Sequence, residues 1–325
     1  LAERNYPIVI FDPHGDYTGL ADVDALRGRV VRYYADFPIF SEDAETVASI
    51  ISNLAYALNP RMRDFFAEVF EATKQFWNDD ETVRQDRMGE LVQIARDPRV
   101  GKYPARKDLW LIGHMAAAAE AAIRGDNAEG RNRLKEWGWQ RIETYNKIDA
   151  STLNAVRNRT YSAAAALTKM ESINRHVARS ATPIPLDRGQ VVQYGQISIV
   201  TLAGYTGDFQ ATIYSILADE LLALRVRSAL RWPVLLVLEE AHNFAPGQAH
   251  TDAESRAIAT TKQIAQEGRK FGVGLVLITQ RPSRLDETTL SQCNSFIVMR
   301  MVNPADQSFV RRAIESMGED DTRLL

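Results

Sequence analysis

Residues 233–244 read PVLLVLEEAHNF. At its centre is an unbroken apolar run from Val234 to Leu238, which is the length of one strand. A run that is apolar at every position is typical of a parallel strand buried on both faces. Glu239 and Glu240 follow at once. Two adjacent carboxylates at a buried strand end are costly to desolvate unless a cation or hydrogen-bond donors offset them. The stretch therefore predicts a strand with a charged site at its end.

Strands and helices alternate on either side of this stretch. Helical patterns begin near 207 and 251, Gly272 is placed to end the second, and Pro304 opens a third. The predicted strands are 6–12, 30–34, 196–202, 234–239, 273–279 and 295–300. This alternation predicts an α/β fold, in which a mostly parallel sheet is covered by helices.

The middle of the chain has a different character. From about 41 to 178 the sequence is rich in Ala, Glu, Arg and Leu, and apolar residues recur at helical spacing. The sequence DRGQ at 187–190 marks the return to strands. We therefore predict three segments: the first part of the α/β core at 1–40, a large helical insertion at 41–188, and the remainder of the core at 189–325.

Composition limits the classes of protein to consider. The 325 residues are 45% hydrophobic and 25% charged, as in globular proteins, and no apolar run reaches the roughly 20 residues of a membrane helix. Cys293 is the single cysteine, which excludes an intramolecular disulfide and favours a reducing, cytoplasmic location. The net charge of −3 predicts that any contact with nucleic acid is local.

Polar residues follow three of the predicted strands: Asp12, then Glu239 and Glu240, then Thr279 and Gln280. The carboxyl ends of parallel strands lie at one edge of a sheet, where ligands of such folds bind. Mg²⁺ is usually held by one or two carboxylates together with substrate phosphates. One acid would anchor Mg²⁺, the next would polarise the attacking water, and an amide would sense the γ-phosphate. The phosphate-binding motif G-x-x-x-x-G-K-[ST] does not occur in these 325 residues.

Three blocks of sequence resemble the HerA family of hexameric DNA-translocating ATPases, which is related to FtsK. The blocks are YPIVIFDPHGDYTGL, VLLVLEEAHNFAP and EGRKFGVGLVLITQRPSRLDETTLSQCNSFIVMRMVNPAD, in the family's order. The resemblance covers roughly 1–36 and 190–325, and it implies a RecA-like P-loop NTPase core that uses ATP and Mg²⁺.

In this family the phosphate-binding loop and its helix precede the FDPHG strand. The sequence LAERN at 1–5 resembles the end of that helix. We therefore expect the chain to be a fragment that begins after the loop and also stops early. A glycine-rich loop ending in Lys-Ser or Lys-Thr is expected about 20–25 residues before Asp12 in the native gene.

The resemblance assigns roles to residues at the sheet edge. Glu239 matches the acid that anchors Mg²⁺, Glu240 the catalytic glutamate and Gln280 the sensor. Asp12 and His14 lie beside the expected phosphate site, where Asp12 would support the groups that bind Mg²⁺ without binding the ion itself. The alternative for each is a polar residue in a turn after a strand. The histidines show no paired spacing of metal ligands, so no zinc site is predicted.

Cations of the site are harder to assign. Arg269 is the first choice for an arginine that completes the site of a neighbouring subunit, although a cation at a helix C-terminus is also favoured by the helix dipole. Arg281 and Arg284 come next, and with Thr279 they complete the candidate nucleotide-binding residues.

Two loops are candidate DNA contacts. In the loop 204–210, Tyr205 or Gln210 would face a pore. The loop 101–107 combines three cations with an aromatic residue, although an ordinary solvated loop is the alternative there.

Two functions from different classes remain open. The first is a homo-hexameric motor that translocates along double-stranded DNA and feeds a partner nuclease of the NurA type. The second is a ring that serves mainly as a scaffold for an effector in bacterial antiviral defence, such as a sirtuin-type NADase. Neither requires a membrane. A dinucleotide-dependent oxidoreductase is excluded, because no G-x-G-x-x-G follows a strand.

Overall fold

The computed structural model describes residues 5–35, 39–77, 80–100, 108–125, 127–185 and 187–313. The chain forms two compact units. The first comprises 1–36 together with 170–325, and the second comprises 37–169. The predicted insertion ended at 188, whereas the compact unit ends at 169, because the segment after it packs with the first unit: Asn174 bonds to Ala35, and residues 182–183 pair with a strand of the sheet.

The first unit is built on a six-stranded sheet with the order β3-β2-β4-β1-β5-β6, in which every paired strand is parallel. The strands are β1 (Ile8–Asp12), β2 (Val30–Tyr34), β3 (Thr182–Pro183), β4 (Ile197–Thr201), β5 (Val234–Leu238) and β6 (Val273–Leu277). In the central register Phe11 lies between Val200 and Leu238, so β1, β4 and β5 end at the same level. The predicted α/β fold with a mostly parallel sheet is confirmed.

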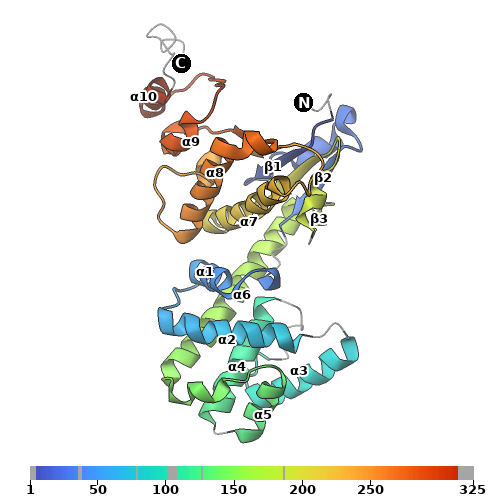
Figure 1. Cartoon of the computed structure of the whole chain (residues 1–325), viewed down its shortest axis with the longest axis vertical. Coiled ribbons are helices and arrows are strands. Elements are labelled where there is room, and N and C mark those ends of the chain that lie inside the picture. Colours follow the sequence, from blue (N-terminus) through green and yellow to red (C-terminus); the bar gives the residue numbers. More distant parts are fainter. Residues whose placement is uncertain are drawn as a thin grey trace. The chain divides into compact units, whose positions relative to one another are not determined.

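Both faces of this sheet are covered, but by different structures. On one face α7 (Gly207–Val226) and α8 (Asp252–Phe271) run side by side (Figure 1). Tyr214 of α7 lies edge-on to Phe11, with ring centroids 5.0 Å apart. On the other face Ile10, Ile199 and Val237 pack with the segment that follows β1, which contains the 3₁₀ helices η2 (Thr18–Asp22) and η3 (Asp24–Leu26). The apolar core therefore lies on both faces of the sheet, and Asp12, Glu239 and Glu240 lie at its carboxyl edge.

Short elements complete the first unit. Gly272 ends α8 with a φ of 73°, in the left-handed conformation that the sequence predicts for a helix stop. The remaining elements are η6 (Arg188–Val191), η7 (Ala241–Asn243), η8 (Pro282–Arg284), α9 (Glu287–Ser291) and α10 (Pro304–Ala313).

One predicted strand is wrong. Residues 295–300 form no strand, and no described residue pairs with them. Ile297 is 95% exposed and Met299 is 79% exposed. A strand requires a hydrogen-bonded neighbour as well as a suitable sequence. Within the described residues β6 pairs only with β5, and its other edge meets no strand.

The second unit is helical, as predicted for this region. Its helices are α1 (Ala44–Leu54), α2 (Pro60–Phe76), α3 (Glu81–Ala95), α4 (Leu109–Arg124), α5 (Ala128–Glu136) and the greater part of α6 (Ala150–Val177), together with the 3₁₀ helices η4 (Ile39–Ser41) and η5 (Ile142–Lys147). Five of these helices begin at an Asp or Asn whose side chain accepts a hydrogen bond from the first turn, which satisfies a free backbone donor there. Phe65, Phe66, Phe70 and Trp139 fill the core of this unit.

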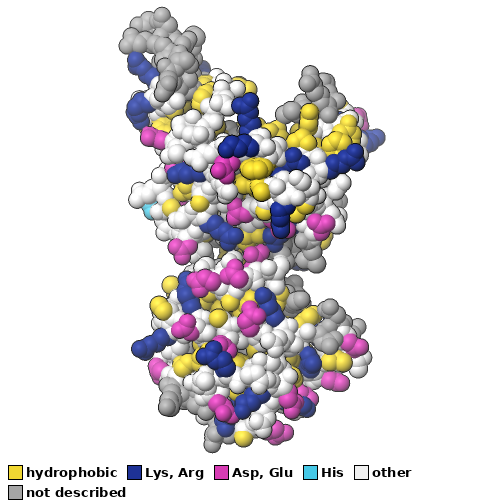
Figure 2. Space-filling model, in the orientation of Figure 1, with side chains coloured by type: hydrophobic (Ala, Val, Ile, Leu, Met, Phe, Trp, Pro, Cys, Tyr) yellow, Lys and Arg dark blue, Asp and Glu magenta, His cyan; other side chains and the backbone are white. Residues whose placement is uncertain are grey.

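The described residues on the face that Figure 2 shows form no broad basic patch. Basic and acidic side chains are interspersed over the visible face of each unit (Figure 2). The loop 101–107, predicted as a possible DNA contact, lies outside the described residues. No helix that the structure describes is long and apolar enough to cross a membrane.

A candidate nucleotide site at the carboxyl edge of the sheet

The loop after β1 is organised by the carboxylate of Asp12. This side chain is fully buried, and Oδ1 accepts hydrogen bonds from the backbone nitrogens of His14 (3.3 Å), Gly15 (2.8 Å) and Asp16 (3.1 Å). Oδ2 accepts from the nitrogen of Tyr17 at 2.9 Å. Burial raises the pKa of Asp12, and the backbone bonds oppose this rise. Both oxygens are therefore occupied in holding the turn, which suits a residue behind a metal site and not a metal ligand.

Gly15 is required at the centre of this turn. Its φ is +87°, which side chains rarely tolerate, and a Cβ would lie 2.5 Å from Cγ1 of Val177. The turn is closed further by the hydroxyl of Thr18, which donates to the carbonyl of Gly15 at 2.8 Å. The sequence PHGD thus forms a tight turn, with His14 exposed at its tip.

Tyr17 links this turn to the first glutamate. Its hydroxyl donates to Oε2 of Glu239 at 2.8 Å. Burial is the main cause of a raised pKa at Glu239, the nearby carboxylates of Glu240, Asp12 and Asp16 raise it further, and the bond from Tyr17 lowers it. Burial, with the contact to Glu239, also raises the pKa of Tyr17 to about 12, so that its hydroxyl remains a donor at neutral pH. Glu239 is thus a partly buried acid in a strongly negative environment.

Glu240 adopts a strained backbone conformation. Its φ and ψ are 46° and 53°, in the left-handed region that residues other than Gly seldom occupy. The side chain is buried, and Oε2 accepts from the backbone nitrogen of Gln280 at 3.3 Å. The nitrogen of Ala241 donates to the carbonyl of Ile278 at 2.8 Å. The ends of β5 and β6 are therefore joined around Glu240.

His242 connects the glutamate to the next strand. Its Nδ1 lies 3.2 Å from Oε2 of Glu240 and 3.2 Å from the hydroxyl of Thr279. Burial lowers the pKa of His242; Glu240 opposes this, while Arg284, Arg281 and His14 act in the same direction as burial. Gln280, Arg281 and Arg284 are exposed at this edge, and no described carboxylate pairs with either arginine.

Arg269 lies elsewhere. It is exposed in the last turn of α8, at the opposite edge of the sheet from Glu240. There it lines a cavity of about 280 Å³ with Tyr6, Pro233 and Gly272, beside the amino ends of β5 and β6. The five residues of β5 separate the two edges by about 16 Å at the usual strand rise. The structure thus brings all the predicted site residues together except Arg269.

Mg²⁺ fits this edge if phosphates and water supply most of its ligands. No group of three or more Asp, Glu, His or Cys side chains in the described residues could hold a metal ion. Two observations favour a cation: three neighbouring carboxylates act on Glu239, and Tyr17 bonds only one of its two carboxylate oxygens. One or two protein carboxylates are what Mg²⁺ uses beside a bound nucleotide.

The structure gives Tyr205, Gln210 and Tyr17 contacts that the sequence does not predict. Tyr205 and Gln210, predicted as pore residues, are each only 6% exposed. The amide of Gln210 donates to the carbonyls of Pro13, Leu202 and Tyr205, so it holds two turns together. The predicted pore role is therefore wrong for both residues. Tyr17 was missed, because nothing in its spacing from Asp12 indicates a contact more than 200 residues away.

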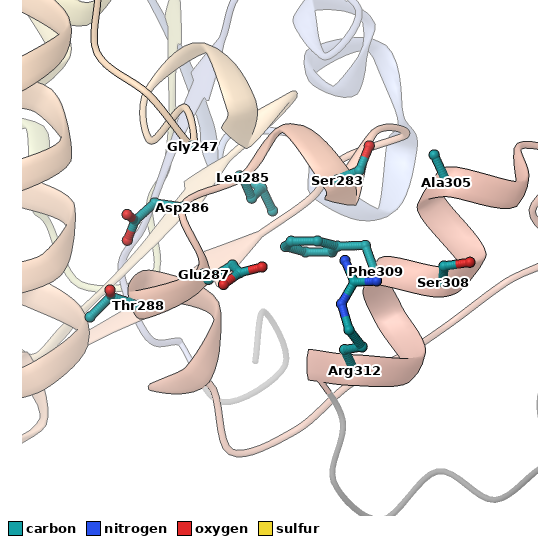
Figure 3. Close-up of a pocket in the computed structure, with 10 residues that line it drawn as sticks. All are labelled: Gly247, Ser283, Leu285, Asp286, Glu287, Thr288, Ala305, Ser308, Phe309 and Arg312. Atoms are coloured by element: carbon teal, nitrogen blue, oxygen red, sulfur yellow. The ribbon is translucent and has the colours of Figure 1, made fainter.

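The same unit has a separate cavity. Its volume is about 600 Å³, it is open to the surface, and it is lined mainly by residues in and around η8, α9 and α10 (Figure 3). Glu287, Phe309 and Arg312 point into it (Figure 3). The buried carboxylate of Asp306 accepts from the nitrogen of Ser283 at 3.0 Å and joins α10 to η8. None of the predicted site residues lines this cavity.

A parallel α/β sheet with paired carboxylates at its carboxyl edge, bonded to the end of the next strand, defines the class of RecA-like folds. The chain belongs to the family described as the central domain of helicase HerA, whose model matches residues 1–221. The matched region includes Asp12 and His14 but ends before Glu239.

The chain is also similar in sequence to proteins that are named HerA. The chain is 49% identical over 92 residues to the DNA double-strand break repair helicase HerA of Pyrococcus furiosus, covering 28% of this chain and 16% of the relative. It is 33% identical over 135 residues to the helicase of the same name from Sulfurisphaera tokodaii, covering 40% and 26%. The chain thus spans about a sixth to a quarter of the length of these relatives.

The fold is also similar to a solved structure. The structure of VirB4 from Thermoanaerobacter pseudethanolicus matches with a TM-score of 0.51 and 13% sequence identity, covering 99% of this chain and 76% of that one. At this identity the likeness concerns the fold alone.

Proposed function

We propose that the whole protein hydrolyses ATP with Mg²⁺ and uses the energy to translocate along double-stranded DNA. The observation that carries this proposal is the pair of glutamates at the sheet edge: Glu239 accepts a bond from the Tyr17 hydroxyl, and Glu240 accepts one from the backbone nitrogen of Gln280, just after β6. The names of the HerA relatives support the DNA substrate. The lone Cys293 favours a cytoplasmic location.

Each residue has a distinct role in this proposal. Bound Mg²⁺ would neutralise charge on the β- and γ-phosphates. Glu239 would hold the metal, while Glu240 would orient a water molecule and accept a proton from it. Gln280 is exposed, and its backbone nitrogen bonds Glu240, so its side-chain amide would be available to sense the γ-phosphate. His14, Thr279, Arg281 and Arg284 would line the phosphate side, and Asp12 supports His14 by fixing the turn that carries it.

The assembly is proposed to be a homo-hexameric ring. Arg269 and Glu240 lie at opposite edges of one sheet, so Arg269 does not reach the carboxylates of its own chain. Head-to-tail packing of identical subunits brings one edge of a subunit to the opposite edge of its neighbour, and such packing closes into a ring when the rotation allows. Arg269 would then complete the neighbour's site.

The helical unit at 37–169 would provide a surface for a dedicated partner protein. In a motor the partner is a nuclease of the NurA type. The second candidate function is a scaffold for a defence effector such as a sirtuin-type NADase, with hydrolysis only as a switch.

Glu240→Gln in the full-length protein tests the proposal. The amide keeps the shape but does not accept a proton, so we expect ATP turnover to fall by about 10²-fold or more. Binding of ATP and Mg²⁺ should persist, and DNA-stimulated turnover and strand translocation by the unmodified ring should both be measurable. Comparable turnover in the variant would refute the role of Glu240.

The same variant separates the two functions. A motor with Glu240→Gln loses translocation and, with it, the processing of long DNA by the partner nuclease. A scaffold keeps the activity of its partner as long as the ring assembles. Partner activity that requires the ring but survives Glu240→Gln therefore favours the scaffold.

A further inference from the structure

We propose that Tyr17 is a positioning residue for Glu239: its phenol holds one carboxylate oxygen, so that the other faces the metal. This inference rests on the proposed function. The observation that carries it is the 2.8 Å bond from the Tyr17 hydroxyl to Oε2 of Glu239, which joins the loop after β1 to the end of β5.

Tyr17 is itself held at both ends. Its backbone nitrogen donates to Oδ2 of Asp12, which fixes the position of the residue at the end of the turn. Its ring packs against the apolar cluster that contains Ile10, Ile199 and Val237. The hydroxyl therefore reaches Glu239 from a rigid support, which is the arrangement that keeps a ligand in one orientation.

Glu239 needs such a partner because its neighbours repel it. The carboxylates of Glu240, Asp12 and Asp16 all act on it, and its own side chain has several rotatable bonds. Without the bond from Tyr17, electrostatic repulsion favours rotamers that turn the carboxylate away from the cluster. Groups that hold metal ligands in this way typically change metal affinity 10- to 100-fold when they are removed.

Tyr17→Phe tests the proposal in the full-length protein, because it removes the hydroxyl and leaves the ring in its apolar cluster. Mn²⁺ serves as the probe, measured by electron paramagnetic resonance in the presence of a non-hydrolysable ATP analogue. We expect the affinity for Mn²⁺ to fall about tenfold. In turnover assays the Mg²⁺ concentration at half-maximal rate should rise by a similar factor, while the rate at saturating Mg²⁺ stays within about twofold of the original.

Tyr33→Phe is the matched control. Tyr33 is buried, whereas Tyr17 is half-buried, and the Tyr33 hydroxyl accepts a bond from Gln196 at 3.2 Å, away from the carboxylates. Its removal should leave Mn²⁺ affinity unchanged, so a general loss of stability is distinguished from a loss of positioning.

Equal Mn²⁺ affinity in Tyr17→Phe and the unmodified protein would overturn the positioning role and leave the proposed function standing. An unmodified protein that neither binds Mn²⁺ with nucleotide nor hydrolyses ATP would instead overturn the proposed function, and the role of Tyr17 with it.

Discussion

Glu240, the proposed catalytic glutamate, has a strained backbone. Its left-handed backbone, with φ at 46°, costs about 1–2 kcal/mol in a residue that has a Cβ. The conformation turns the chain sharply after β5, so that Ala241 bonds to Ile278 and the Glu240 carboxylate meets the nitrogen of Gln280. Such outliers cluster at functional sites, where the surrounding contacts enforce them.

This strain predicts an unusual order of stability among two inactive variants. Glu240→Gly and Glu240→Ala both remove the carboxylate, but only glycine adopts the left-handed conformation freely. We expect the glycine variant to be more stable than the alanine variant by about 1 kcal/mol. The free energies of unfolding from urea titrations measure the difference. An alanine variant of equal or greater stability would show that the backbone at this position is unstrained.

The residues of the site were only partly predictable from the sequence. Glu239, Glu240, Thr279 and Gln280 were found because they end apolar strands, and strand ends are visible in a linear pattern. Tyr17 was not found, because its partner lies on another strand and only the register of β1 beside β5 brings the two together. Asp12 was predicted, but its bonding to a whole turn depends on backbone geometry that the sequence does not state.

At the scale of elements, helix α4 contains a buried histidine with a clear thermodynamic consequence. His114 is fully buried, and its Nδ1 lies 2.9 Å from the hydroxyl of Tyr161, while Nε2 has no partner among the described residues. Burial lowers the pKa of His114 to about 4; Asp97 opposes this shift and Arg99 adds to it. The imidazole is therefore neutral in the folded unit.

This histidine predicts acid sensitivity of the helical unit. Since the pKa is lower in the folded state, the unfolded chain binds the proton first, and stability is lost as pH falls from about 6.5 to about 4. A shift of this size corresponds to at most about 3 kcal/mol. Hydrogen exchange of α4 amides at several pH values measures the loss. His114→Asn, which does not titrate, should flatten the profile in this range, and parallel profiles for the two proteins would contradict the assignment.

Elements were predicted well where packing and pairing agree with the local pattern. β1, β2, β4, β5 and β6 lie where apolar runs predict them, because burial on both faces leaves a signal at every position. Residues 295–300 are also mostly apolar, yet they form no strand. A strand needs a partner strand to pair with, and the sequence of the segment does not show whether the sheet provides one. The helical unit was predicted from spacing and composition, but its end was misplaced, since α6 runs through both units without a break in pattern.

For the whole molecule, the important feature is the separation of Glu240 from Arg269 on one sheet. In a ring each site then combines the carboxylates of one subunit with the arginine of the next. Arg269→Ala should leave assembly and nucleotide binding intact and lower turnover by about 10³-fold, the scale of a lost arginine finger.

Mixing two inactive subunits tests this arrangement. In rings assembled from Glu240→Gln and Arg269→Ala subunits, some interfaces pair an intact Glu240 with an intact Arg269, so ATP turnover should reappear. If both residues served the same subunit, every site would stay damaged and no activity would return despite proven co-assembly. A helix-end role for Arg269 predicts a third result, a stability loss of roughly 0.3–1 kcal/mol with turnover barely changed. In either of these cases Arg281 and Arg284 become the residues to test.

Residues 295–300, which pair with no strand, contain an exposed methionine whose oxidation can be measured. Met299 is 79% exposed, whereas Met115 in α4 is fully buried. Peroxide converts accessible methionine to its polar sulfoxide, so Met299 is oxidised well before Met115. Its oxidation places a polar sulfoxide in a segment that also exposes Ile297 and Val302. If another molecule covers this segment, Met299 should be protected from peroxide. The sulfoxide content at Met299, measured by mass spectrometry, therefore shows whether the segment was exposed during the treatment.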